Sequence, residues 1–134
     1  MQIITLAGIT FPIIIILDYI WIQIIAKSFY MTQLADFMAP KPYIPAAVVF
    51  YIIYSVAIAY FVVSPALGTN SIMYALAVGA FFGLVAYATW DLTNMTIMAN
   101  WPLALTIVDI AWGAFVTAAS GALTYLIATR FLGM

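Results

Sequence analysis

The sequence predicts an all-α membrane protein with four transmembrane helices in an antiparallel up-down bundle. Of its 134 residues, 69% are hydrophobic and only 5% are charged, and the mean hydropathy is +1.23. A soluble domain carries about a quarter charged residues, so this chain has too few charges to cover a surface in water. Lipid is the solvent that suits it. The apolar runs are continuous rather than alternating, which argues against a transmembrane β-barrel.

Four apolar runs are long enough to cross a bilayer, which takes about 20 residues in a helix. The first run has no basic segment before it and no small-residue cleavage pattern after it, so we expect a retained span rather than a signal peptide. Pro45 suits the first turn of the second helix, and Ser71 suits the N-cap of the third. The predicted spans are 3–26, 44–66, 72–98 and 102–129, within one domain that covers residues 1–134.

The connections between the spans predict the topology. Short turns make spans two, three and four sequential antiparallel neighbours, whereas 27–43 is a longer polar connection. An even number of spans places both termini on one face. Lys27 and Lys41 lie in the connection and Arg130 lies on the terminal face, so the positive-inside rule favours a cytoplasmic connection with both termini outside.

The missing residue types narrow the chemistry. The chain has no cysteine and no histidine, and its net charge is −1. The absence of cysteine excludes disulfides and thiol catalysis, and the absence of histidine excludes the usual haem ligand and the ordinary neutral-pH base. We therefore expect no metal and no cofactor, and no nucleic acid as a partner. The expected partners are the lipid bilayer, a small-molecule or lipid ligand, and a second copy of the chain, with a dimer as the expected homo-oligomer.

Three aspartates lie inside the predicted spans. A charged side chain at mid-bilayer costs about 2.5–3.5 kcal/mol on insertion scales, so an intramembrane acid indicates a functional site. Asp18, Asp91 and Asp109 each lie about eight residues from the face that carries the 27–43 connection. At a rise of 1.5 Å per residue, each is about 12 Å below that face. We therefore expect the three acids to form one layer.

Helical periodicity places further polar and aromatic side chains beside these acids. At about 100° per residue, Tyr87 and Asn94 fall on the same face of the third span as Asp91. The second span brings two tyrosines to the same depth, and a tryptophan stands within three residues of each acid. The candidate pocket, open toward the connection, therefore consists of Asp18, Trp21, Tyr51, Tyr54, Tyr87, Trp90, Asp91, Asn94, Asp109 and Trp112.

Small residues on the same faces predict close helix packing. Gly79 and Gly83 are spaced by four residues on the third span, and Gly113 lies on the polar stripe of the fourth.

A structural interpretation also exists for the acids, which hydroxyl and indole donors can hold in place between helices. Like charges in one site of low dielectric cannot all ionise, so we expect at least one neutral aspartate, with Asn94 and tyrosines donating to the others.

Several short motifs resemble a bacterial family of small predicted membrane proteins, domain-of-unknown-function family 2177. Asp-Leu-Thr-Asn at 91–94 and Asp-x-x-Trp-Gly at 109–113 are the most specific, and position 90 holds Trp where the resemblance leads us to expect Tyr. The resemblance implies a four-span protein of the bacterial inner (plasma) membrane and no assigned activity. Its matching stretches are 17–21, 27–30, 50–51, 54, 79–83, 87–94, 101–102 and 109–113.

Three functions are compatible with these features. The first is a protein whose intramembrane pocket binds or carries a proton, a cation or a small organic or lipid-like molecule. The second is a membrane enzyme, or an accessory to one, that modifies fatty-acyl lipids with the aspartates as acid and base. The third is a structural subunit of a membrane complex. No catalytic residue can be assigned, because no nucleophile stands beside a base.

Overall fold

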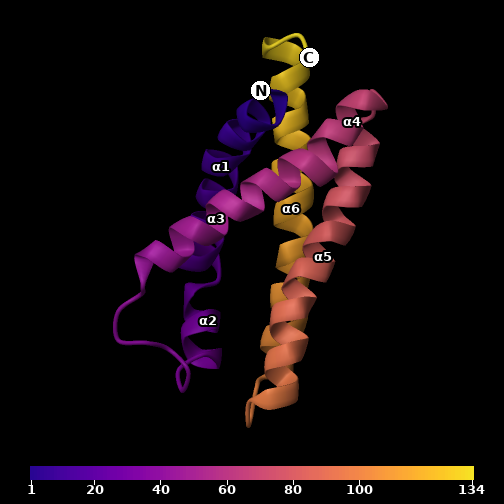
Figure 1. Cartoon of the computed structure of the whole chain (residues 1–134). Helices are drawn as coiled ribbons and strands as arrows, with labels where there is room; N and C mark the ends of the chain where they lie inside the picture. The colour runs from indigo at the N-terminus through magenta and orange to yellow at the C-terminus, as the bar shows by residue number, and fades with distance from the viewer.

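The structure, a computed structural model, describes all 134 residues and contains no strand. Four of its helices are long and apolar enough to cross a membrane, so the predicted all-α membrane fold is confirmed. Figure 1 shows both termini at the same end of the bundle. The elements are α1 (Gln2–Ile20), η1 (Trp21–Ile25), α2 (Lys27–Gln33), α3 (Ile44–Ile58), η2 (Ala59–Val63), α4 (Ser64–Gly68), α5 (Ile72–Ile97) and α6 (Leu103–Phe131).

The helix ends follow local chemistry. Pro45 lies in the first turn of α3, and the side chain of Ser71 accepts a hydrogen bond from the backbone N–H of Tyr74 at the start of α5. Asn70 and Asn100 take positive φ angles of 50° and 60° in the two short turns, a conformation that asparagine tolerates well. The spanning segments run over Gln2–Ile25, Ile44–Gly68, Ile72–Ile97 and Leu103–Phe131.

Helices α5 and α6 form the most closely packed pair. A Cβ atom added to Gly83 would lie 2.0 Å from the carbonyl oxygen of Gly113, and one added to Gly79 would lie 2.9 Å from the Cα atom of Ala118. The two backbones therefore touch directly, as small residues allow between membrane helices. On the other side of Gly113, the ring of Tyr87 fills the space that a side chain would need.

Helix α3 departs from the predicted arrangement. It packs on α1 and crosses the bundle obliquely, and the second span approaches α5 mainly through η2 and α4 (Figure 1). The prediction that spans two and three are antiparallel neighbours is thus wrong for the half that carries the connection. Bulky rings explain the difference, because Tyr54 stacks on Phe82 with centroids 5.8 Å apart. The contact between α5 and α6 is made by glycines, whereas the contact between α3 and α5 is made by aromatic side chains.

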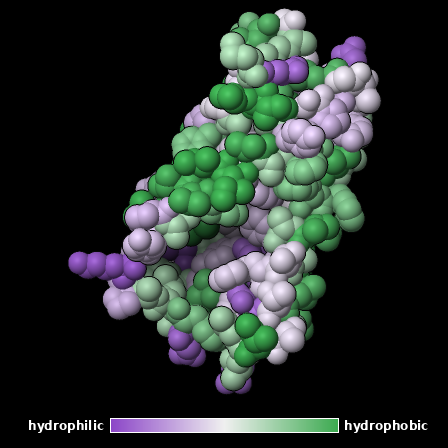
Figure 2. Space-filling view, viewed as in Figure 1, coloured by the Kyte–Doolittle hydropathy of each residue, from purple (hydrophilic) through white to green (hydrophobic).

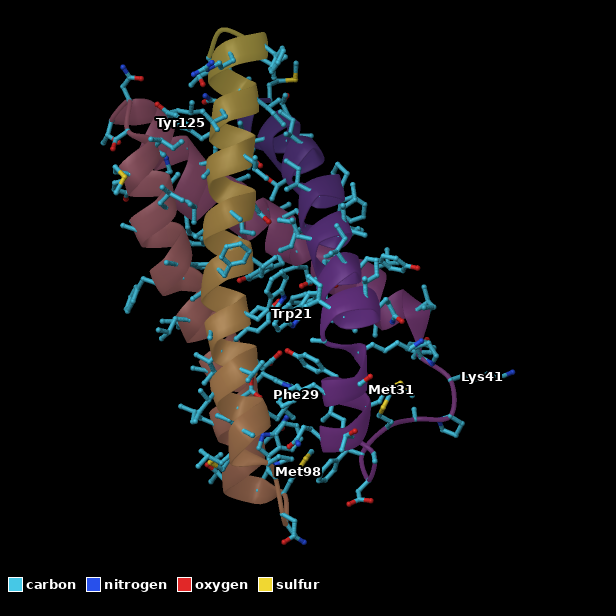
Figure 3. The ribbon with its side chains drawn as sticks, turned by 180° about the vertical axis from the view of Figure 1, so that it is seen from behind. Trp21, Phe29, Met31, Lys41, Met98 and Tyr125 are labelled. Atoms are coloured by element: carbon cyan, nitrogen blue, oxygen red, sulfur yellow. The ribbon has the colours of Figure 1, made fainter.

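The polar connection also differs from the prediction, because it contains a helix. The first span ends at Ala26, whose φ and ψ of −109° and 11° leave the helical region. The chain then continues into α2 (Lys27–Gln33). Figure 3 shows α2 beside the lower half of α6. Helix α6 has 29 residues and is therefore about 43 Å long, which exceeds the roughly 30 Å hydrocarbon core of a bilayer. Helix α2 reaches α6 through the hydrogen bond that Tyr30 donates to Asp109.

The half of the bundle near the termini is closed and mostly apolar. Its buried side chains include Leu6, Ile14, Ile58 and Val116, none of which has any exposed surface. Two polar contacts cross it: a hydrogen bond of 3.0 Å between the hydroxyl groups of Thr10 and Thr124, and one of 3.2 Å that the Tyr125 hydroxyl donates to Oδ1 of Asn70. The intramembrane acids therefore belong to the other half of the molecule.

We predict that Gly83→Ala destabilises the bundle, because its new methyl group would collide with backbone atoms of α6. Overpacking of this kind costs about 1–3 kcal/mol, and the thermal midpoint in detergent should fall accordingly. Gly8→Ala is the matched control, since a Cβ atom there meets nothing within 4 Å. Equal midpoints for the two variants would show that the contact between α5 and α6 does not support the fold.

Candidate functional site

Asp18 is held by donors from two other helices. The residue is 4% exposed, and its carboxylate accepts hydrogen bonds from the hydroxyl of Tyr51 at 2.8 Å and from Nε1 of Trp112 at 2.7 Å. Hydrogen bonds to a charged acceptor contribute about 1.5–3 kcal/mol each. This carboxylate therefore links α1 to α3 and to α6.

Asp109 is held from the connection. Its Oδ1 atom accepts a hydrogen bond of 2.7 Å from the hydroxyl of Tyr30 on α2, and that hydroxyl in turn accepts one of 3.2 Å from Nε1 of Trp21. Burial, and then the hydrogen bond to Asp109, raise the pKa of the Tyr30 hydroxyl above its ordinary value. Tyr30 therefore remains a donor, and it fastens α2 to the bundle.

Stacked indole rings connect the two acids. The rings of Trp21 and Trp112 lie 4.5 Å apart and are inclined by 4°. Trp112 donates to Asp18, while Trp21 donates to the tyrosine that holds Asp109. The stack places both indole N–H groups on the side of the acids, so it supports both carboxylates at once.

Asp91 lies in a different environment. It has no exposed surface, and neither of its carboxylate oxygens has a hydrogen-bond partner. It lies within hydrogen-bonding reach of the carboxyl of Asp109. The amide nitrogen of Asn94 is buried without a partner too, so the expectation that Asn94 donates to an acid is wrong. It lies almost a full turn beyond Asp91 on α5.

The three acids do not converge on one point. Side chains lean toward the N-terminus of their own helix, and α5 and α6 are antiparallel, so Asp91 and Asp109 lean toward each other. Asp18 lies instead with Trp112, which follows Asp109 on α6 by almost one turn. The arrangement is a pair of carboxyls and a separate carboxylate. No group of three acidic side chains converges closely enough to hold a metal ion.

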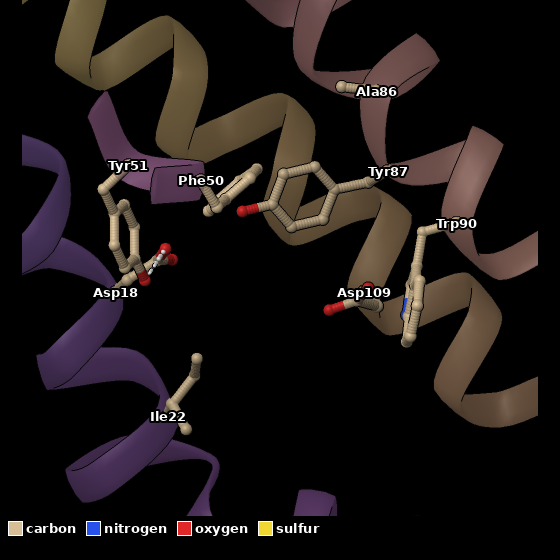
Figure 4. A pocket seen from close by; sticks show the side chains of 8 residues that line it. All are labelled: Asp18, Ile22, Phe50, Tyr51, Ala86, Tyr87, Trp90 and Asp109. Atoms are coloured by element: carbon tan, nitrogen blue, oxygen red, sulfur yellow. Dashed lines mark hydrogen bonds between the residues drawn. The ribbon is translucent and has the colours of Figure 1, made fainter. Parts of the chain in front are cut away.

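A cavity of about 350 Å³ separates Asp18 from Asp109. Figure 4 shows both carboxyls directed into it from opposite walls, with the hydroxyl of Tyr87 between them. No side chain of the protein forms a hydrogen bond with that hydroxyl. The lining consists of Asp18, Ile22, Phe50, Tyr51, Ala86, Tyr87, Trp90 and Asp109.

The cavity opens sideways between α3 and α5. Figure 2 shows the hollow on this face, with polar residues at its bottom, hydrophobic ones along its upper edge and residues of intermediate hydropathy to its right. Trp90 stands at the opening and is 57% exposed. The sequence predicted an opening toward the 27–43 connection. On that side lies a second cavity, lined mostly by residues of the connection, which shares Ile22 with the first. The gap between α3 and α5 follows from the oblique course of α3.

The predicted pocket residues thus fall into two groups. Asp18, Tyr51, Tyr87, Trp90 and Asp109 line the cavity. The others lie behind it, and Tyr54 is turned away to share a hydrogen bond of 2.7 Å with Thr117. Sequence reasoning missed Tyr30, whose signal was an aromatic residue in the only polar stretch. It also missed the apolar lining residues Ile22, Phe50 and Ala86, for which only their helical phase gave a signal.

Four spanning helices around buried acids define a small multi-pass membrane protein. The chain belongs to the family described as predicted membrane protein (DUF2177), which matches residues 3–126. The resemblance inferred from the short motifs is therefore confirmed. Comparison with curated proteins and with solved structures found no match.

We predict that Tyr51→Phe lowers stability, because Asp18 loses one of its two donors while it stays buried. The expected cost is about 1.5–3 kcal/mol, measured as a shift of the thermal midpoint in detergent. Tyr60→Phe is the matched control, since Tyr60 is 59% exposed on the second span. A midpoint that falls equally in both variants, or in neither, would contradict the role given to the Tyr51 hydroxyl.

Proposed function

We propose that this protein binds a small amphiphilic molecule from the membrane, one whose polar end donates hydrogen bonds and is neutral or positively charged. The observation that supports the proposal is the cavity between Asp18 and Asp109, which opens between α3 and α5. A site of this kind is concave, mostly apolar and equipped with a few convergent polar groups.

The charges of the cavity select the polar end of the ligand. Two carboxyls line it, and no lysine or arginine does. A ligand with an anionic end would therefore be repelled by these carboxyls, and no positive charge would offset the repulsion in a medium of low dielectric, where charges interact strongly. A hydroxyl or an ammonium group can instead donate to the free lone pairs of the Asp18 and Asp109 carboxylates.

Tyr87 supplies a third contact for the polar end. Its hydroxyl points into the cavity and has no partner within the chain. A phenolic hydroxyl is both a donor and an acceptor, so it matches an alcohol as well as an amine. Its ring is fixed against Gly113, and the hydroxyl is therefore already positioned before a ligand arrives.

The apolar lining and the lateral opening select the rest of the ligand. Ile22, Phe50 and Ala86 surround the polar groups with hydrocarbon. A chain that leaves the cavity between α3 and α5 enters the bilayer directly, so its apolar part never contacts water. Burial of each methylene contributes about 0.8 kcal/mol, which favours a molecule with an alkyl chain.

We predict that n-octylammonium and n-octanol bind the wild-type protein in nanodiscs of dioleoyl phosphatidylcholine, whereas octanoate does not. Calorimetric titration, corrected with empty nanodiscs, measures the affinity. Asp109→Asn should weaken octylammonium binding by about tenfold or more, because a hydrogen bond to a charged group is lost.

The matched control is Asp36→Asn, which removes an exposed carboxylate of the connection and should leave the affinity unchanged. Octanoate binding as tight as octylammonium binding would contradict the proposed selectivity. Conversion of a bound probe into a product would favour the enzyme interpretation instead.

A further inference from the structure

The pair formed by Asp91 and Asp109 has fewer hydrogen-bond donors than it needs. Asp91 is completely buried, and both of its carboxylate oxygens lack a partner. Its polar neighbour is the Asp109 carboxyl, which already receives the hydroxyl of Tyr30 at 2.7 Å. One donor therefore serves two carboxyl groups.

A proton on Asp91 resolves this shortage. Two ionised carboxylates are acceptors only and cannot bond to each other, and an unpaired buried charge costs several kcal/mol. A protonated Asp91 becomes a donor, and its O–H can bond to the Asp109 carboxylate. The chain of donation then runs from Asp91 to Asp109 on one side, and from Trp21 through Tyr30 to Asp109 on the other.

No neighbouring side chain supplies a positive charge that would offset the negative charge of the pair. The titratable groups that face it are Tyr30 on α2, Tyr87 on α5 and, across the cavity, Asp18 on α1. The first two are neutral phenols and the third is an acid, so none supplies a positive charge. The buried amide of Asn94 does not reach either carboxyl.

We infer that Asp91 and Asp109 share one proton in the resting protein, and that this proton competes with a cationic headgroup that enters the cavity at Asp109. The second half of the inference rests on the proposed function, whereas the first half does not. Asp109 is the link, because it both borders Asp91 and lines the cavity.

The sign of the competition follows from charge. The shared proton and an ammonium group are both positive, so each weakens the binding of the other at the same carboxyl pair. By linkage the effect is reciprocal. A cationic ligand therefore binds more tightly as the pH rises and the pair loses its proton, and its binding at lower pH releases protons. A neutral alcohol has no such dependence.

The shared proton can be tested without a ligand, because the chain has only four acidic side chains and all are aspartates. Carbon-13 labelling of the aspartate carboxyls should yield four side-chain signals by NMR. We expect one protonated carboxyl at pH 7, absent in Asp91→Asn and retained in Asp18→Asn and Asp36→Asn. As the pH rises, its signal and that of Asp109 should change together. If Asp91→Asn does not fold, subtraction with the other two variants and Asp109→Asn still assigns the signal. Four ionised carboxyls, or a protonated Asp18 in place of Asp91, would overturn the inference.

The competition is tested by titration with octylammonium and octanol at several pH values. Octylammonium affinity should rise with pH in the wild type and stay constant in Asp91→Asn, whose amide donates permanently to Asp109. Octanol affinity should not change with pH in either protein. A pH-independent octylammonium affinity in the wild type overturns the competition and leaves the proposed function standing. Failure of both probes to bind overturns the competition together with the proposed function, while the carboxyl signals still decide on the shared proton.

Discussion

A carboxyl group buried in a membrane protein needs hydrogen-bond donors, and this need organises the half of the molecule that carries the 27–43 connection. Asp18 on α1 receives its donors from α3 and α6, and Asp109 on α6 receives one from α2. Each acid thus recruits a different element. Asp91 is the exception, since only another acid lies within its reach. Asp18 and Asp109 therefore hold helices of this half together, and both line the cavity.

The two halves of the bundle differ because their helix contacts differ. Glycines let the backbones of α5 and α6 touch, and apolar side chains fill the end near the termini. Where α3 passes α5, the stacked rings of Tyr54 and Phe82 lie between the two helices. A rigid pair of helices thus carries Tyr87 and Asp109, while a diverging helix opens the way to them. A chain of 134 residues thus combines a packed core with a cavity between α3 and α5.

The sequence predicted the part of this structure that composition and periodicity govern. Hydropathy located the four spans to within a few residues, and the cost of charge in lipid placed the three acids away from it. Sequence reasoning missed what depends on helix crossing. The oblique course of α3 follows from the sizes of side chains on two helices at once, and the docking of Tyr30 follows from a break at Ala26. Neither has a periodic signal within one segment, so the opening of the cavity and the separation of Asp18 from the Asp91–Asp109 pair were not predictable.

The central claim is that the cavity between α3 and α5 holds the polar end of a molecule from the bilayer. A crystal structure of the protein grown in a lipidic mesophase tests it most directly. We expect elongated density that enters between α3 and α5 and ends within hydrogen-bonding distance of Asp109 and the Tyr87 hydroxyl. A structure in which α3 closes against α5 and the two acids meet no ligand would contradict it, and the acids would then serve only to hold the helices together.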